Sequence, residues 1–125
     1  MPDISGALLR EVWMSIQEDI LQLLHALGHI YANHGQTKRG LVLQLIASRL
    51  EPENKAVLRT LAYTFLNDGS PERALAVIAR LRSLNEDDPS LDLLHSRALW
   101  DAGYEIEARR AFRDFLDRRR QPPHV

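Results

Sequence analysis

The chain contains no cysteine, carries almost no net charge and has no long hydrophobic run. The absence of cysteine excludes disulfides, thiolate metal sites and cysteine nucleophiles, and it suits a protein of the reducing cytoplasm. Because 16 lysines and arginines stand against 17 aspartates and glutamates, the chain as a whole is not attracted electrostatically to nucleic acid or to an acidic membrane. We therefore expect neither nucleic-acid binding nor membrane insertion.

Signatures of targeting and catalysis are also missing. The N-terminal sequence MPDISGALLREVW has an early acid and no long apolar run, so it matches neither a secretory signal nor a membrane span. The sequence contains no glycine-rich phosphate loop, nucleophile elbow or paired-carboxylate site. These absences favour a soluble, cytoplasmic protein that is not an enzyme and needs no cofactor.

The stretch 58–81, LRTLAYTFLNDGSPERALAVIARL, predicts two short helices folded back on one another. Gly69 can adopt the left-handed conformation that ends a helix, Ser70 can cap the next helix, and Pro71 fits its first turn. On both sides of the turn, apolar residues recur at spacings of three and four residues, as on one face of a helix: Leu58, Leu61, Phe65, Ala74, Ile78 and Leu81. Neither helix can bury its apolar face alone, so the pair is expected to stack on neighbours.

The neighbours are copies of the same pair. Gly35, Gly69 and Gly103 recur every 34 residues, which is the period of the tetratricopeptide repeat. Other columns keep this period: small residues at Gly28, Ala62 and Ser96 and at Gly40, Ala74 and Ala108, and bulky residues at Tyr31, Phe65 and Leu99. The small columns predict a close crossing of the two helices in each repeat. We therefore predict an all-α, tetratricopeptide-like solenoid of three antiparallel helix pairs preceded by an N-terminal helix.

The repeats are predicted at about 21–54, 55–88 and 89–120, with a disordered tail over 121–125. Asp88 can cap the third repeat, and Pro89 can open its first helix. That helix is the least regular, because Asp92 and His95 occupy positions where earlier copies have leucine. A rotated helix and a shift of register both explain the irregularity.

Residues 1–20 precede the repeats and place their apolar residues mostly on one side of a helix. Asp3 or Ser5 can cap this helix, which either continues into the first repeat or breaks near Ser15. It is interpreted either as a cap covering the first repeat or as a docking helix for a dimer or partner. The second helix of repeat one, LVLQLIASRL, is apolar most of the way round, so either the N-terminal segment or a partner must cover it.

Two clusters, one of histidines and one of arginines, are candidate chemical sites. His25 and His29 lie one helical turn apart and His34 follows, a spacing that can hold zinc. No carboxylate completes the set, which favours groove or surface histidines over a metal site. Arginines concentrate near the C-terminus, interspersed with acids: Arg109, Arg110, Arg113, Arg118, Arg119 and Arg120. This pattern favours a solvated face, with an acidic patch on a partner as the alternative.

The first helix of each repeat is expected to line the inside of the solenoid and to form a peptide-binding groove. Rings and leucines there can bury apolar side chains of a ligand, while arginine and asparagine can bind its carbonyls or carboxylates. The alternative is that the aromatic residues pack within the protein. The groove residues are predicted to be His25, His29, Asn33, Arg59, Tyr63, Leu66, Asn67, Leu93, Arg97 and Trp100.

The segment 23–81, with its RLEPEN break and GSPERA turn, and the segment DAGYEIEARRAFRDFLDRRR resemble the small tetratricopeptide-fold chaperones of bacterial type III secretion systems. The likeness covers about residues 21–120 and is greatest to the YscY (SctY) type. It implies a heterodimer with a small secreted client of the YscX type and delivery of that client to the export gate. Needle-subunit and translocator chaperones share the fold and remain alternatives, and the N-terminal 20 residues are longer than in the YscY type.

The main hypothesis is therefore a non-enzymatic chaperone that holds a helical or extended segment of a secretion client in its groove. A generic adaptor scaffold joining two folded proteins is the rival interpretation. A metal-dependent enzyme built on His25 and His29 is a third.

Overall fold

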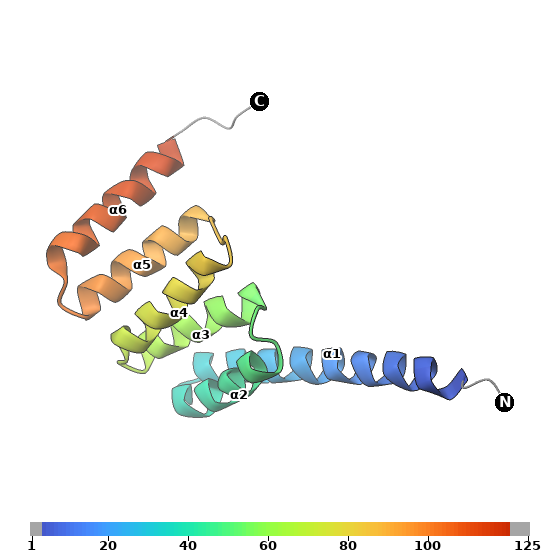
Figure 1. The fold of residues 1–125 in the computed structure, drawn as a ribbon. Helices are drawn as coiled ribbons and strands as arrows, with labels where there is room; N and C mark the ends of the chain where they lie inside the picture. Colours follow the sequence, from blue (N-terminus) through green and yellow to red (C-terminus); the bar gives the residue numbers. More distant parts are fainter. Residues whose placement is uncertain (1–3, 121–125) are drawn as a thin grey trace.

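The computed structural model describes residues 4–120, and within that range the chain is all-helical (Figure 1). The six helices of this range are α1 (Ile4–Asn33), α2 (Thr37–Leu50), α3 (Lys55–Asn67), α4 (Pro71–Ser83), α5 (Pro89–Asp101) and α6 (Glu105–Arg120). The all-α prediction is confirmed. The predicted tail 121–125 and the candidate cap Asp3 lie outside the described residues.

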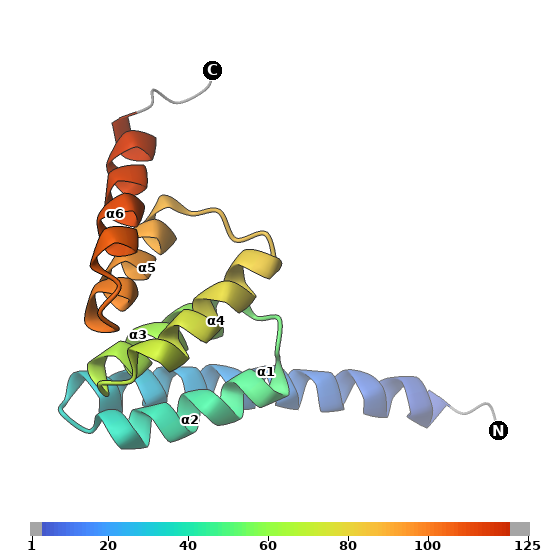
Figure 2. The ribbon, with the colours of Figure 1, turned by 60° about the vertical axis from the view of Figure 1, so that its left-hand side comes forward.

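Successive helices pair as α1 with α2, α3 with α4, and α5 with α6. The middle pair lies between the other two, so that α1 and α2 form one end of the molecule and α5 and α6 the other (Figures 1 and 2). The short turns within the pairs make their helices antiparallel.

The three turns within the pairs have the same backbone conformation. Gly35, Gly69 and Gly103 have φ angles of 80°, 74° and 92°, a left-handed conformation that residues with a side chain rarely adopt. One backbone N–H···O bond recurs across the three turns: Gln36 to Tyr31 (2.9 Å), Ser70 to Phe65 (2.8 Å) and Tyr104 to Leu99 (2.8 Å). The 34-residue period of the sequence is therefore a period of the backbone.

The predicted close crossing of paired helices is confirmed. All six residues of the two small columns are buried. The approach is tightest between α1 and α2, where a Cβ added to Gly40 would lie 2.5 Å from the carbonyl oxygen of Gly28. In the third pair, Ser96 Oγ instead donates a hydrogen bond of 2.8 Å to the carbonyl of Ala108.

Two of the helix starts have side-chain caps. Asn54 accepts a hydrogen bond from the backbone N–H of Val57 (3.1 Å), and Asp88 accepts one from that of Ser90 (2.9 Å). The backbone and side-chain hydrogen bonds from Ser90 hold the pKa of Asp88 below its usual value. The predicted cap at Asp88 is confirmed, whereas Ser70 makes no side-chain capping hydrogen bond and α4 begins at Pro71 without one.

The main core cluster joins α2 to α5, and the middle pair supplies most of it. Its buried residues are Leu41, Leu58, Leu61, Ala62, Phe65, Leu66, Ala74, Ile78, Leu81, Leu91 and Ala98. A smaller cluster of Leu21, Ala47 and Val57 joins α1, α2 and α3. Both end pairs therefore bury less apolar surface than the middle pair and leave apolar side chains exposed.

Residues 4–33 form one uninterrupted helix, so the N-terminal segment does not break near Ser15. Residues 6–20 are all exposed, and this part of α1 projects away from the remaining helices (Figures 1 and 2). The segment therefore does not cover the first helix pair. On α2, Val42, Leu45, Ile46 and Leu50 are exposed as well.

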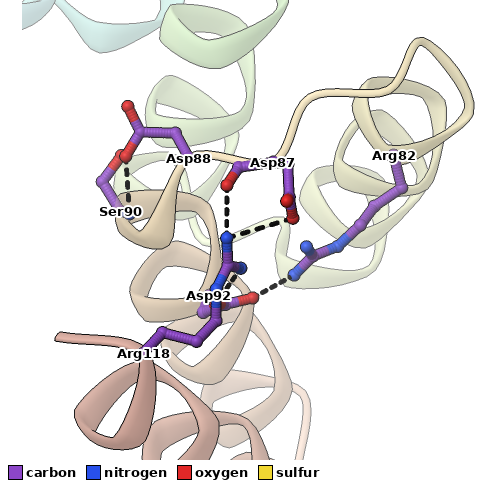
Figure 3. Close-up of polar contacts among 6 residues, drawn as sticks. All are labelled: Arg82, Asp87, Asp88, Ser90, Asp92 and Arg118. Carbon is purple, nitrogen blue, oxygen red and sulfur yellow. Dashed lines mark hydrogen bonds and ion pairs between the residues drawn. The ribbon is translucent and has the colours of Figure 1, made fainter. Parts of the chain in front are cut away.

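The irregular first helix of repeat three keeps its register. Leu91, Ser96 and Ala98 are buried like their counterparts 34 residues earlier, so α5 is neither rotated nor shifted. Asp92 stays buried because Arg82 of α4 (2.7 Å) and Arg118 of α6 (2.6 Å) bind its carboxylate (Figure 3). A pair of ion pairs thus replaces the apolar contacts that leucine makes in the earlier copies.

Arg118 also binds the loop between α4 and α5. Its guanidinium also contacts the Asp87 carboxylate at 3.1 Å and donates to the backbone carbonyl of Asp87 (Figure 3). These contacts fix α6 against the loop between α4 and α5, and they position α6 relative to α5 for the groove described next.

Candidate functional site

The predicted residues of α1 lie beside α3. The His25 ring is 3.0 Å from the Thr60 hydroxyl, and His29 Nε2 is 3.0 Å from the side-chain amide nitrogen of Asn33. His25 and His29 line a shallow pocket with Gln22, Ala26 and Thr60. In the range 4–120 no group of three or more histidines and carboxylates is arranged to hold a metal ion.

The predicted residues of α3 and α5 contact one another. The Arg97 guanidinium lies 5.5 Å from the centroid of the Tyr63 ring and donates a hydrogen bond of 3.1 Å to Asn67. Arg59 forms an ion pair of 2.5 Å with Glu86. The helices α1, α3 and α5 therefore carry a continuous band that contains most of the predicted groove residues, although ion pairing already engages the Arg59 guanidinium.

Leu66 is not available to a ligand, so its prediction as a groove residue is wrong. Its side chain is only 5% exposed and belongs to the main core. Trp100, 34 residues later, occupies the same repeat position and is 51% exposed. The physical reason is the place of each helix in the stack: α3 is covered on both sides, whereas no helix of the described range packs beyond the α5/α6 pair.

Three predicted residues, Leu93, Arg97 and Trp100, line a groove between α5 and α6 of about 580 Å³. We call it the α5/α6 groove. Its other lining residues come mainly from α6: Ser96, Ala108, Arg109, Phe112, Arg113 and Leu116. Predicted residues therefore form most of the α5 wall of this groove, and the α6 wall was missed.

The α6 wall was missed for two reasons. Phe112 corresponds to Ile78 of the second repeat, an apolar position that is buried there, yet in the last pair Phe112 is half exposed. Arg109 and Arg113 belong to the concentration of arginines whose pattern favours a solvated face, with an acidic patch on a partner as the alternative. The available signal was the position of this repeat as the last of the three, since within residues 4–120 no further helix pair covers it.

The groove combines an apolar floor with a cationic rim. Leu93, Trp100 and Phe112 are each about half exposed, an arrangement that binds apolar side chains. Among the described side chains, no carboxylate lies within 4.0 Å of Arg109 or Arg113. Their guanidinium groups can bind the carboxylates of a ligand in bidentate geometry.

Comparison of the chain with protein-family models and with curated proteins finds no match. Within residues 4–120, no helix has both the length and the apolar character needed to cross a bilayer. The function therefore has to be argued from the surfaces of the molecule.

Proposed function

We propose that this protein is a non-enzymatic chaperone of the type III secretion kind, which holds a segment of a small secreted client and helps bring it to the export apparatus. The single observation that carries the proposal is the α5/α6 groove, whose apolar floor is half exposed and whose rim is cationic. The band across α1, α3 and α5 would extend the binding surface. In this proposal the client is a YscX-like protein and the complex is a cytoplasmic heterodimer.

The proposal assigns the helix pairs to a tetratricopeptide-like solenoid. Its support is the shared left-handed glycine of the three turns and the burial of both small columns at the same 34-residue spacing. In such a stack the first helices line the concave side, where α1, α3 and α5 carry the band.

The groove predicts the chemistry of the client segment. Fully burying an exposed apolar side chain contributes roughly 1.5–3 kcal/mol. Because Leu93, Trp100 and Phe112 are about half exposed, together they can supply roughly 2–4.5 kcal/mol, about a quarter to a half of the free energy of micromolar binding. The arginines of the rim favour a segment in which leucine or aromatic residues alternate with aspartate or glutamate. Needle-subunit and translocator proteins with such a segment are alternative clients.

The experiment is co-expression of the chain with products of neighbouring reading frames, followed by affinity measurement with the client that copurifies. Trp100→Ala combined with Phe112→Ala should weaken binding by about ten- to a hundredfold, because two half-exposed anchors are lost. Ile106→Ala is the matched control, since Ile106 is an exposed α6 residue outside the groove. Unchanged affinity in the double variant, with helical content intact, would reject the groove as the client site.

A generic adaptor is the second candidate, and one observation favours it: exposed apolar side chains occur at both ends of the molecule, on α1 and α2 as well as at the α5/α6 groove. An adaptor would bind two folded proteins at once, whereas the proposed chaperone holds one client. Size-exclusion chromatography of copurified complexes distinguishes a ternary assembly from a binary one.

A further inference from the structure

An unbroken heptad pattern runs along α1. Apolar residues alternate at spacings of four and three, which are the a and d positions of a coiled coil: Leu9, Trp13, Ile16, Ile20, Leu23, Leu27 and Ile30. Except for the half-buried Leu27, these residues are exposed, by fractions from 43% at Ile16 to 67% at Leu9. We call this set the α1 seam.

The α1 seam is distinct from the face of α1 that packs within the chain. Gly28 faces α2, where its nearest neighbours are Gln44 and Gly40, and His25 faces α3 through Thr60. These contacts and the buried Leu21 lie between the seam positions, on another side of the helix. Residues 6–20 are all exposed and pack on no other helix of the described range 4–120, and a helical segment of that length is marginally stable in water without a partner.

The exposed edge of α2 continues the seam. Tyr31, which follows the seam residue Leu27 by one turn, lies in a common pocket with Val42 and Leu43 of α2. Ile46 and Leu50 extend this edge along α2 and are exposed. One apolar surface thus runs from the projecting half of α1 across its packed half to α2.

We propose that the α1 seam pairs in antiparallel orientation with the α1 seam of a second copy of this chain. The arrangement is isologous, so each copy contributes the same surface twice. The projecting half of one α1 then lies on the packed half of the other α1 and along the exposed edge of α2. A parallel pair would leave that edge of α2 uncovered.

One register pairs six of the seven seam residues with one another and leaves Ile30 opposite Gly6. When Ile16 faces Ile20 of the second copy, Trp13 faces Leu23 and Leu9 faces Leu27. Each layer then joins an a position with a d position, as antiparallel pairing requires. Asp19 lies at the exposed flank near the centre, where its repulsion with the Asp19 of the second copy is screened by solvent and salt.

The surface area that this pairing would bury is in the range found for specific dimers. Seven partly exposed seam side chains, at roughly 60–100 Å² each, remove about 400–700 Å² per copy, or about 800–1,400 Å² in all. The α2 edge adds to this sum and brings it into the range of about 1,200–2,000 Å² that stable interfaces bury. A second copy is therefore a sufficient occupant without any additional partner.

The test is the solution mass of the purified full chain, measured by sedimentation velocity from about 1 to 100 μM, a range that brackets the micromolar affinity expected of such an interface. The wild-type chain should reach twice the monomer mass. Leu9→Glu combined with Ile16→Glu should weaken the dimer by about a hundredfold or more, because two charges would be buried in the seam. Both positions lie in the projecting half, so the helix pairs should keep their circular dichroism and thermal transition.

Leu8→Glu combined with Ser15→Glu is the matched control, because it adds the same two charges next to Leu9 and Ile16 but off the seam, and it should remain dimeric. A monomeric wild type at all concentrations overturns the proposal, and so does a dimer that survives the two seam glutamates. A monomer that instead binds a client through the seam residues overturns it in favour of a foreign partner helix. The seam and the α5/α6 groove are different surfaces, so the dimer can fail without the groove failing. Where both proposals hold, two chaperone–client heterodimers join through the seam.

Cysteine cross-linking tests the orientation, since the chain contains no cysteine of its own. In the antiparallel register, Ile16→Cys protein should form a disulfide with Ile20→Cys protein when the two are mixed, and neither should cross-link efficiently alone. Disulfide formation requires Cα atoms within about 7 Å. Efficient cross-linking of Ile16→Cys with itself would show a parallel dimer and overturn the antiparallel arrangement.

Discussion

The buried carboxylate of Asp92 lies 2.6 Å from the guanidinium of Arg118, across the interface between α5 and α6 (Figure 3). Its other oxygen accepts a hydrogen bond from Arg82 of α4 at 2.7 Å. In the second repeat the same position is the buried Leu58. The third pair is therefore attached to the second by charge where the earlier repeat uses apolar packing, and this makes its attachment sensitive to single substitutions.

Arg118→Ala should lower the free energy of unfolding by about 1–2 kcal/mol, because the buried carboxylate loses one of its two charged partners. The estimate is below that for a fully buried pair, since about a third of the Arg118 side chain is exposed. Urea denaturation followed by circular dichroism measures it.

Asp92→Leu introduces the residue type found at Leu58. It should lower the free energy of unfolding by less than Arg118→Ala does, or even raise it, because a buried ion pair is often no more favourable than a packed apolar side chain. If Asp92→Leu is the more destabilising of the two, the carboxylate contributes net stability and this account of the interface is wrong.

His95 should make stability depend on pH. Burial is the main cause that lowers its pKa from the ordinary 6.5, and Arg82 acts in the same direction, while Asp92 opposes them. The folded state thus binds a proton at His95 less readily than the unfolded state does. The contribution of His95 to the free energy of unfolding is therefore fully present above pH 6.5 and is lost as the pH falls below it. His95→Leu should reduce the loss of unfolding free energy between pH 7.5 and pH 5.5.

The carboxylates of the chain also contribute to acid destabilisation, so the measured quantity is the difference between wild type and His95→Leu at each pH. His29→Leu serves as the control, because His29 is an exposed histidine of α1. Equal pH slopes for wild type and His95→Leu would contradict the prediction.

The 34-residue columns predicted the helix pairs, the turn glycines and the close crossings, because those features depend on contacts within one repeat. They did not predict burial at the ends of the stack. Leu66 and Trp100 occupy one repeat position, yet the first lies in the core and the second lines the groove. Exposure there depends on whether another pair follows, which a repeat period alone does not specify.

Contacts between residues far apart in the sequence were also not predicted. The partners of Asp92 lie on α4 and α6, and nothing in the spacing of Arg82 or Arg118 identifies them among the other arginines. The N-terminal segment was predicted to be helical and lies in α1, but its projection from the molecule depends on what α2 and α3 leave uncovered. For the same reason, the α6 wall of the groove became evident only in three dimensions.

Gly40→Ala should be markedly destabilising. A methyl group at this position would lie 2.5 Å from the carbonyl oxygen of Gly28 and 2.9 Å from the backbone nitrogen of Ala32, so α1 and α2 would have to separate. We expect a loss of about 2–3 kcal/mol in the free energy of unfolding, as for other overpacked cores. Thermal and urea denaturation measure it.

Gly35→Ala is the appropriate comparison for Gly40→Ala. Its methyl group would meet nothing within 4 Å, so only the left-handed backbone, with φ of 80°, is strained. That strain is expected to amount to about 1 kcal/mol. Equal losses in the two variants would show that the α1/α2 crossing can relax and that its tightness is not a constraint.

Gln44→Leu should stabilise the protein. Gln44 is 0% exposed, and neither its amide nitrogen nor its amide oxygen makes a hydrogen bond. The corresponding residue of the second repeat is the buried Ile78, so an apolar side chain suits this position. Removing an unsatisfied buried amide should raise the free energy of unfolding by about 1–3 kcal/mol.

Gln22→Leu, at an exposed glutamine of α1, should change the free energy of unfolding by less than about 0.5 kcal/mol. A loss of stability in Gln44→Leu would mean that the amide is bonded in solution and that this position has a polar role in joining α1 to α2.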